Sequence, residues 1–244
     1  MTNEVIFLQE DALNLSVPDN YVDLVVTSPP YFGIETARYG GNPKAQINSD
    51  KDAKKMLSLL VKSAKECERV LKSTGCLWIN IGAVRNKSLP YEFVHLVLKH
   101  TNLKFLGEIY WDYSKPGERE ERLSANHGLW LHFVNDTHNM YFNPFTVKRY
   151  SSGAWVLPGN NESSLIDQKL LKEGFAYDTF PEEIPKRLIE MFTKPGHVVL
   201  DPFGGTGVAA VTAYKMGRVG ITNDISADQV KLAKRRLELV KESK

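Results

Sequence analysis

A strand, a turn with three glycines and the start of a helix follow one another in VVLDPFGGTGVAA, residues 198–210. This order constrains the fold strongly, because a buried strand that passes through glycines into a helix is typical of a mostly parallel α/β sheet. From residue 197 onward the chain holds only about two strands, too few for a stable sheet. We therefore expect strands from the N-terminal part of the chain to complete the sheet around this turn.

Strand-like and helix-like segments alternate along the rest of the sequence. Short apolar segments predict strands at residues 5–8, 22–26, 76–82, 105–111, 197–201 and 219–224. Helical spacing of apolar residues predicts helices at residues 52–71 (with Gly75 to end that segment), 91–100, 180–192, 208–216 and from 227 towards the end. No element is assigned between residues 129 and 175, and the polar segment 112–128 is expected to be a long surface loop. The predicted fold class is α/β, a doubly wound, mostly parallel sheet with helices on both faces.

The composition fits one globular domain. The chain has 244 residues, 25% charged and 42% hydrophobic, and no apolar run is long enough to cross a bilayer. Its beginning lacks the basic and then apolar pattern of a secretory signal, so we expect a cytoplasmic protein. Cys67 and Cys76 are too few for a disulfide framework and lack the spacing of a metal site, which favours two reduced, buried thiols. A net charge of +2 permits a polyanionic partner without requiring one.

The glycine turn is predicted to seat a cofactor. A helix start offers unpaired N–H groups, and Asp224, about twenty residues further on, is placed to accept hydrogen bonds from both hydroxyls of a ribose. Asp201 precedes the glycines, where a carboxylate repels a pyrophosphate but suits an ammonium group. These acids indicate a cationic cofactor without phosphate, such as S-adenosylmethionine. Gly205, Gly207 and Ala210 also satisfy the loose dinucleotide fingerprint, so an NAD-dependent oxidoreductase is an alternative.

A second unusual turn, TSPPYFG at residues 27–33, follows the predicted strand at 22–26. Two prolines cannot continue a central strand, because they donate no ladder hydrogen bonds. Ligands of parallel α/β sheets bind at the carboxyl ends of the strands. We therefore expect this turn and the glycine turn to lie on the same edge of the sheet.

Together these segments resemble the amino-methylating DNA methyltransferases of the β group, in which the catalytic motif precedes the cofactor motif. The family's (Asp/Asn/Ser)-Pro-Pro-(Tyr/Phe) motif is matched by Ser28–Tyr31, followed in order by FPEEIPKRLI, DPFGGTG and Asp224. Matching segments run from about Asp11 to about Ser226. The resemblance implies a Rossmann-like S-adenosylmethionine-dependent methyltransferase domain over residues 1–244 with circularly permuted motif order. It also implies an insertion at residues 112–176 for target recognition and DNA contact.

The resemblance implies the roles of individual residues. The catalytic residues would be Ser28, Pro29, Pro30 and Tyr31. The cofactor-binding residues would be Asp201, Pro202, Phe203, Gly204, Gly205, Thr206, Gly207, Asp224, Asp11, Phe180 and Pro181. Asp11 would lie near the adenine of the cofactor, although a solvated acid in a turn explains it equally well. Trp111, Lys115 and Pro116 would shape the catalytic pocket or form an ordinary strand end and turn.

Double-stranded DNA is the implied partner, and contact with it needs basic residues near the site. The candidates, each of which is also explained as a solvated surface charge, are Arg38, Lys44, Lys115, Arg119, Arg122, Lys148 and Arg149. The C-terminal KLAKRRLELVKESK reads as a solvated helix face rather than a DNA arm. A cognate restriction endonuclease and a second copy of the chain are further partners that the resemblance suggests. No metal is implied.

Ser28 in the first motif position favours methylation of cytosine N4, because the family's adenine N6 enzymes more often carry aspartate or asparagine there. Adenine N6 remains the alternative within the family. RNA or protein amides are alternative substrates, and a non-catalytic binding module is a further alternative. A cytosine C5 enzyme would need a nucleophilic cysteine beside proline and glutamine, and neither Cys67 nor Cys76 has these neighbours.

Overall fold

The computed structural model describes residues 3–30, 53–81, 88–112, 127–150, 153–157, 164–173 and 179–243. The strands are β1 (Val5–Leu8), β2 (Val22–Thr27), β3 (Leu71–Ile81), β4 (Lys104–Asp112), β5 (His127–Val134), β6 (Ala154–Val156), β7 (Val198–Asp201) and β8 (Val219–Asn223). The helices are α1 (Ala53–Val70), α2 (Leu89–His100), α3 (Pro144–Tyr150), α4 (Leu165–Lys172), α5 (Glu183–Phe192), α6 (Val208–Lys215) and α7 (Ala227–Glu242). None of the helices in these ranges is long and apolar enough to span a membrane.

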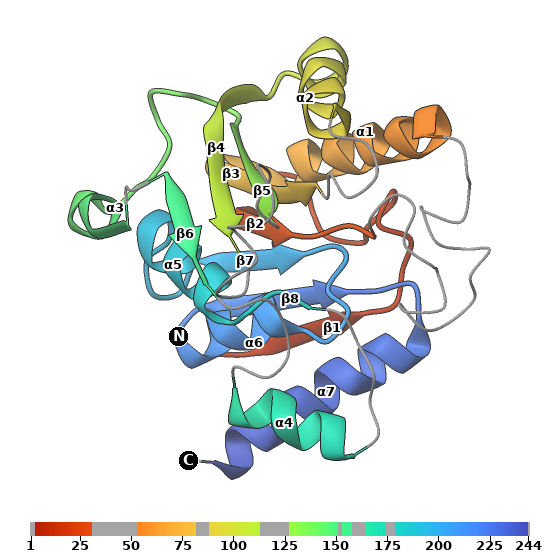
Figure 1. Ribbon diagram of the computed structural model, residues 1–244, viewed down its shortest axis with the longest axis vertical. Coiled ribbons are helices and arrows are strands. Elements are labelled where there is room, and N and C mark those ends of the chain that lie inside the picture. The colour runs from red at the N-terminus through yellow and green to blue at the C-terminus, as the bar shows by residue number, and fades with distance from the viewer. Residues whose placement is uncertain are drawn as a thin grey trace, which may run out of the picture.

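The described strands form one sheet in the order β1-β8-β7-β2-β3-β5-β4-β6 (Figure 1). Neighbours from β1 to β3 run parallel, whereas β5 runs antiparallel to both β3 and β4. The C-terminal pair β7 and β8 therefore lies between β1 and β2, so strands from the two ends of the chain complete one sheet around the glycine turn. This confirms the predicted topology and the mostly parallel α/β class.

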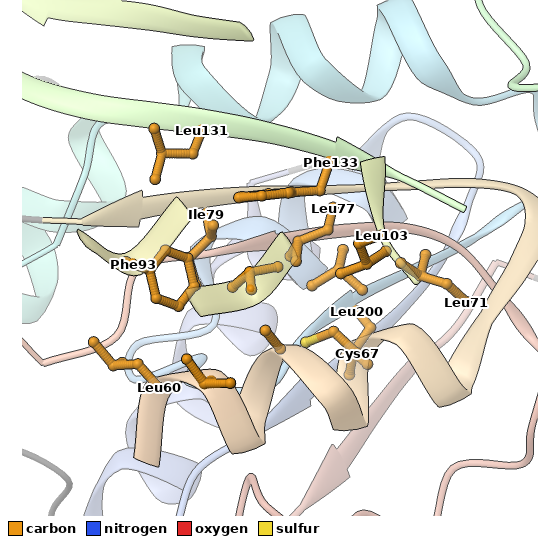
Figure 2. Packing of buried hydrophobic residues seen from close by; sticks show 14 of the residues in the cluster. Leu60, Cys67, Leu71, Leu77, Ile79, Phe93, Leu103, Leu131, Phe133 and Leu200 are labelled. Atoms are coloured by element: carbon orange, nitrogen blue, oxygen red, sulfur yellow. The ribbon is translucent and has the colours of Figure 1, made fainter. Parts of the chain in front are cut away.

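Helices cover both faces of the sheet. On one face, α1 and α2 bury Leu60 and Phe93 against Leu77 of β3 and Phe133 of β5 (Figure 2). On the other face, α5 and α6 pack against a core that includes the tryptophans of β3, β4, β5 and β6. All six residues of β2 are buried, as expected for a central strand with both faces covered.

The end of α1 differs from the prediction. We expected Gly75 to stop the helix, but α1 ends at Val70 and β3 begins directly at Leu71, so Gly75 lies inside the strand. A Cβ on Gly75 would lie 2.9 Å from the Asp23 carbonyl oxygen of β2. The glycine is therefore explained by the close approach of two strands next to a register shift in β2, not by a helix end.

The segment without assigned elements, residues 129–175, forms most of β5, then α3, β6 and α4. The polar segment 112–128 is only partly described, with β4 extending to Asp112 and β5 beginning at His127. Cys67 and Cys76 are free and buried, as predicted. Burial raises the pKa of the Cys67 thiol to about 12 and also raises that of Cys76, so neither thiol is suited to act as a nucleophile.

Helix α2 offers a test of the packing. Phe93 is fully buried, whereas Leu98 on the same helix is 47% exposed. We expect Phe93→Ala to lower the free energy of unfolding by about 3–5 kcal/mol, because it leaves a cavity between the helix and the sheet. Leu98→Ala is the matched control and should cost less than about 1 kcal/mol. Urea unfolding of both variants measures the difference, and similar losses would contradict the described docking of α2.

Candidate active site

The two unusual turns meet because β2 and β7 are neighbours. Leu24 pairs with Val199 and Val25 with Leu200, so the chain leaves both strands at the same edge of the sheet. There the Thr27 hydroxyl donates a hydrogen bond of 2.7 Å to Oδ1 of Asp201. Both side chains are buried. This bond joins the Ser-Pro-Pro turn to the glycine turn, and it confirms that they share an edge.

Asp201 is buried, with 1% of its surface exposed. Its Oδ1 also accepts a hydrogen bond of 3.1 Å from the backbone N–H of Phe203. The pKa of this carboxyl group is raised to about 7, mainly by burial; the two hydrogen bonds lower it, and the negative charge of Asp224 contributes to the rise. The group is therefore poised between its neutral and ionised forms near neutral pH. A cation that arrives beside it would favour the ionised form.

The glycine turn can be built only from glycines at several positions. Gly205 and Gly207 have φ angles of +48° and +74°, in the left-handed region. A Cβ on Gly204 would lie 1.9 Å from Oγ1 of Thr222 in β8, which leaves no room for a side chain. Gly207 is the N-cap of α6 and makes no side-chain cap, so the first turn of the helix presents its N–H groups without one. A bare backbone at a helix start fits a cofactor that approaches closely.

Asp224 follows β8 and closes the other side of the turn. Its Oδ2 accepts a hydrogen bond of 3.1 Å from the N–H of Gly205, and its Oδ1 one of 2.8 Å from the N–H of Ser226. Burial raises the pKa of Asp224, while these backbone bonds lower it. A carboxylate has about four lone-pair sites, so both oxygens keep acceptor capacity for a ribose. The predicted spacing of the acid from the glycines thus corresponds to a direct contact between them.

Asn223, which the sequence analysis did not single out, ties a third segment to this site. Its Nδ2 donates to the carbonyl oxygens of Glu10 and Pro202, at 3.1 and 3.0 Å, and its Oδ1 accepts the N–H of Glu10 at 2.9 Å. The side chain is fully buried at a strand end. The sequence signal for Asn223 was its place directly before Asp224, the acid predicted to bind a ribose. Asn223 holds the segment after β1 against the glycine turn.

Residues 22–235 match the sequence profile of the N6/N4 DNA methylase family, which covers most of the chain. The chain belongs to this family. The type II methyltransferase M.ScaI of Streptomyces caespitosus is 24% identical over 269 residues, spanning 97% of this chain and 82% of that protein. The DNA adenine methyltransferase YhdJ of Escherichia coli K12 is 26% identical over 243 residues, spanning 91% and 78%.

Solved structures share the fold. The cytosine-N4-specific PvuII DNA methyltransferase superposes with a TM-score of 0.78 at 19% identity, covering 97% of this chain and 87% of that one. The TTHA0409 protein of Thermus thermophilus, solved with S-adenosyl-L-methionine, gives 0.67 at 22% identity, covering 98% and 94%. The family's methyl donor is S-adenosylmethionine, which confirms the cofactor prediction. The order of motifs is that of the β group, as predicted.

The methylase motif residues lie at the shared edge as far as they are described. Ser28, Pro29 and Pro30 follow β2 directly, with Ser28 partly exposed and Pro29 buried. Tyr31 lies outside the described residues, as do Arg38, Lys44, Lys115, Pro116, Arg119 and Arg122. Asp11 lies just beyond the Glu10 contact, and its Oδ1 accepts the N–H of Leu13 at 3.0 Å. This hydrogen bond within the turn fits the alternative explanation of Asp11 as a solvated turn acid.

Phe180 and Pro181 are buried just before α5. The Phe180 ring meets Trp130 of β5 edge to face, with 5.3 Å between ring centroids. Trp111 is also buried, and its Nε1 donates to the Leu157 carbonyl oxygen at 3.1 Å. Both tryptophans belong to the same core as Phe180. Trp130 was missed because its segment showed no clear periodicity in the sequence.

Lys148 and Arg149 lie exposed on α3, at a distance from the two turns. The segment before α3 is bound at the C-terminal end of α5, where the N–H of Asn143 donates to the Met191 carbonyl oxygen at 2.7 Å. In Figure 1, α3 lies at the left, whereas β7 points to the right, towards the glycine turn. The described structure therefore does not bring these two basic residues beside the cofactor turn.

The raised pKa of Asp201 predicts a pH-dependent stability. Between about pH 4 and pH 7 the unfolded carboxyl group is ionised while the folded one keeps its proton, so this group lowers the stability as pH rises. Asp201→Asn keeps a neutral acceptor and loses the titration. Its stability relative to wild type should grow by up to about 1.4 kcal/mol per pH unit across that window. Urea unfolding between about pH 5 and pH 8 measures this, and parallel pH curves would refute it.

Proposed function

We propose that this methylase transfers a methyl group from S-adenosylmethionine to the exocyclic N4 of a cytosine in double-stranded DNA, at a specific site. The Thr27–Asp201 hydrogen bond carries the proposal, because it fixes the Ser-Pro-Pro turn beside the cofactor turn. Ser28 and the cytosine-N4 specificity of the structurally similar PvuII enzyme support cytosine. Adenine N6 is the second candidate, supported by the similarity to the adenine methyltransferase YhdJ.

The chemistry asks the protein to expose a lone pair. The amino group of cytosine is a poor nucleophile, because its lone pair is delocalised into the ring. In our proposal the Ser28 side chain and the Pro29 carbonyl oxygen each accept a hydrogen bond from the amino group. These two bonds aim the nitrogen lone pair at the methyl group. The prolines hold these acceptors in place before the reaction. Tyr31 stacks on the base after it has rotated out of the duplex.

The cofactor residues follow from the same arrangement. When bound, S-adenosylmethionine would supply the methyl group of its cationic sulfur: the N–C bond would form as the S–C bond breaks, S-adenosylhomocysteine would leave, and the amino nitrogen would lose one proton to solvent. We propose that the cofactor packs closely against the backbone of residues 202–207, that Asp224 binds its ribose and that Asp201 binds its ammonium group. Asp11, Phe180 and Pro181 are assigned to the walls of the cofactor site. The described contacts of Gly205 with Asp224 and of Thr27 with Asp201 support this division.

DNA contact is assigned to residues 112–176 and to the basic residues around the catalytic turn. Charge on these residues would neutralise phosphates, as the family's substrate requires. A cytoplasmic location is part of this proposal, since the substrate is cellular DNA. A cognate restriction endonuclease is proposed from the type II relatives, and a second copy of the chain remains a proposed partner.

Mass spectrometry of nucleosides tests the choice of base. DNA treated with the protein and S-adenosylmethionine should yield N4-methylcytosine, and sequencing the modified sites would give the recognition sequence. If the only modified nucleoside is N6-methyladenine, the cytosine proposal is wrong and adenine N6 takes its place. Parallel reactions with RNA and protein are the controls, and methylation confined to them would refute the DNA substrate.

Tyr31 tests the role of the catalytic turn. Tyr31→Ala should lower kcat on the order of tenfold or more, because stacking on the rotated base is lost. The dissociation constant for S-adenosylmethionine should stay within about twofold, because in this proposal the ring contacts the base only. Tyr21→Ala, at a partly exposed tyrosine just before β2, is the matched control and should leave both values unchanged. A loss of cofactor affinity in Tyr31→Ala would place the ring at the cofactor instead.

A further inference from the structure

A buried arginine of α7 holds the glycine turn from behind. Arg236 Nε donates to the carbonyl oxygen of Thr206 at 2.8 Å, and Nη2 donates to the Thr206 hydroxyl at 3.2 Å. Both residues are 3% exposed. Thr206 stands between the left-handed Gly205 and Gly207, at the centre of the turn. One guanidinium therefore contacts both the backbone and the side chain of Thr206, the central residue of the turn.

The helix that carries Arg236 also touches the turn one position later. A Cβ on Gly207 would lie 2.8 Å from the Cβ of Ala233, so α7 is in close contact with the turn at this point. Ala233 and Arg236 are three residues apart and lie on the same helix face. Because the peptide group is planar, fixing the Thr206 carbonyl also fixes the direction of the Gly207 N–H that follows it. The face of α7 thus sets the geometry at the start of α6.

Arg236 is itself held by α4. Its Nη2 lies 2.5 Å from Oδ1 of Asp167, which is 4% exposed. The other carboxylate oxygen of Asp167 accepts the Ser164 hydroxyl at 2.5 Å, and the Asp167 N–H donates back to Ser164 Oγ at 3.0 Å. Leu170 of α4 packs with Leu232 and Leu239 of α7. Figure 1 shows α4 lying against α7.

A buried ion pair is weak evidence for stability, because removing two charges from water costs about as much as their attraction returns. Apolar residues at these two positions would hold the two helices together equally well. What the guanidinium adds is a fixed fork of N–H donors that can bind Asp167 and Thr206 at the same time. Its geometry therefore points to positioning of the turn rather than to helix docking.

We propose that Arg236 is a positioning residue for S-adenosylmethionine, acting through Thr206, and that Asp167 fixes the guanidinium. The docking of α4 is then part of the support of the cofactor site, although α4 precedes the glycine turn by more than thirty residues. The proposal rests on the cofactor of the family and does not depend on whether cytosine or adenine is methylated.

Neighbouring residues provide matched controls. Arg235 also links α7 to the end of α4, with hydrogen bonds of 2.7 and 3.0 Å to Glu173, but it lies on the surface and does not contact the turn. Arg235→Met and Glu173→Gln thus remove an ion pair between the same two segments. Arg236→Met, Arg236→Lys and Asp167→Asn are the test variants. All are measured in the full chain by thermal unfolding without cofactor, calorimetric binding of S-adenosylmethionine, and steady-state methylation.

We expect Arg236→Met to raise the dissociation constant and the cofactor KM about tenfold or more, the size of effect typical of a lost hydrogen bond to a charged group. At saturating cofactor, kcat should stay within about twofold, because the catalytic turn is unchanged. Arg236→Lys should recover part of the affinity, since one ammonium can reach Thr206 or Asp167 but lacks the fork. Asp167→Asn should weaken binding less than Arg236→Met, because an amide oxygen still accepts.

Two results would overturn the proposal. The first is a lower melting temperature in Arg236→Met with unchanged cofactor affinity, which would show a purely structural ion pair. The second is an equal loss of affinity in Arg235→Met, which would show a general effect of helix docking. If Arg236→Met does not fold, Asp167→Asn against Glu173→Gln decides, and equal affinities in that pair would likewise refute the proposal.

Discussion

The parallel pairing of β2 with β7 is the constraint on which the site depends. Thr27 and Asp201 are 174 residues apart, yet the register of the two strands brings them within one hydrogen bond. Because the catalytic turn follows Thr27 at once and the cofactor turn follows Asp201 at once, this pairing sets their separation. Neither turn can shift along its strand without a change of register, and a slip by one residue would move every buried residue of β2 to the opposite face. Val25 packs in the core on one face, and Leu24 and Val26 pack in the core on the other, so a one-residue slip would exchange side chains between two closely packed cores.

The electrostatics of the turn bear on the kind of cofactor. Asp201 and Asp224 flank the same glycines, and burial raises the pKa of both. A pyrophosphate at this helix start would meet the Asp201 carboxyl group, whose ionised form repels it. Asp224 does not distinguish the two cofactors, because an acid at this position binds the ribose of either one. A cofactor with an ammonium group would instead stabilise the ionised form of Asp201. The loose glycine fingerprint also fits an NAD enzyme, but the buried Asp201 argues against a pyrophosphate, in agreement with the family match.

Residues near the turns could be predicted from the sequence because their signals are local. Glycines before a helix, prolines after a strand and an acid at the next strand end each reflect a backbone requirement within a few residues. Other site residues depend on register and packing between distant elements. Asn223 looks like any strand-end asparagine until β1 is placed beside β8, and Gly75 looks like a helix stop until β3 is placed beside β2. Trp130 belongs to β5, which lies between the preceding strand β4 and the more distant strand β3.

Arg235 and Arg236 show most clearly what the sequence alone cannot predict. In the sequence they are one basic pair on an amphipathic helix, and the expectation of a solvated face holds for Arg235, which binds three glutamates at the surface. Arg236 instead lies beside Leu237 and Val240 on the buried stripe, where an arginine is retained only with partners for its donors. The stripe of Val230, Ala233, Leu237 and Val240 identifies the inward face, but the identity of the partners depends on the packing of α4 and the glycine turn. A charged residue within such a stripe is buried, and the packing of other elements decides which groups it binds.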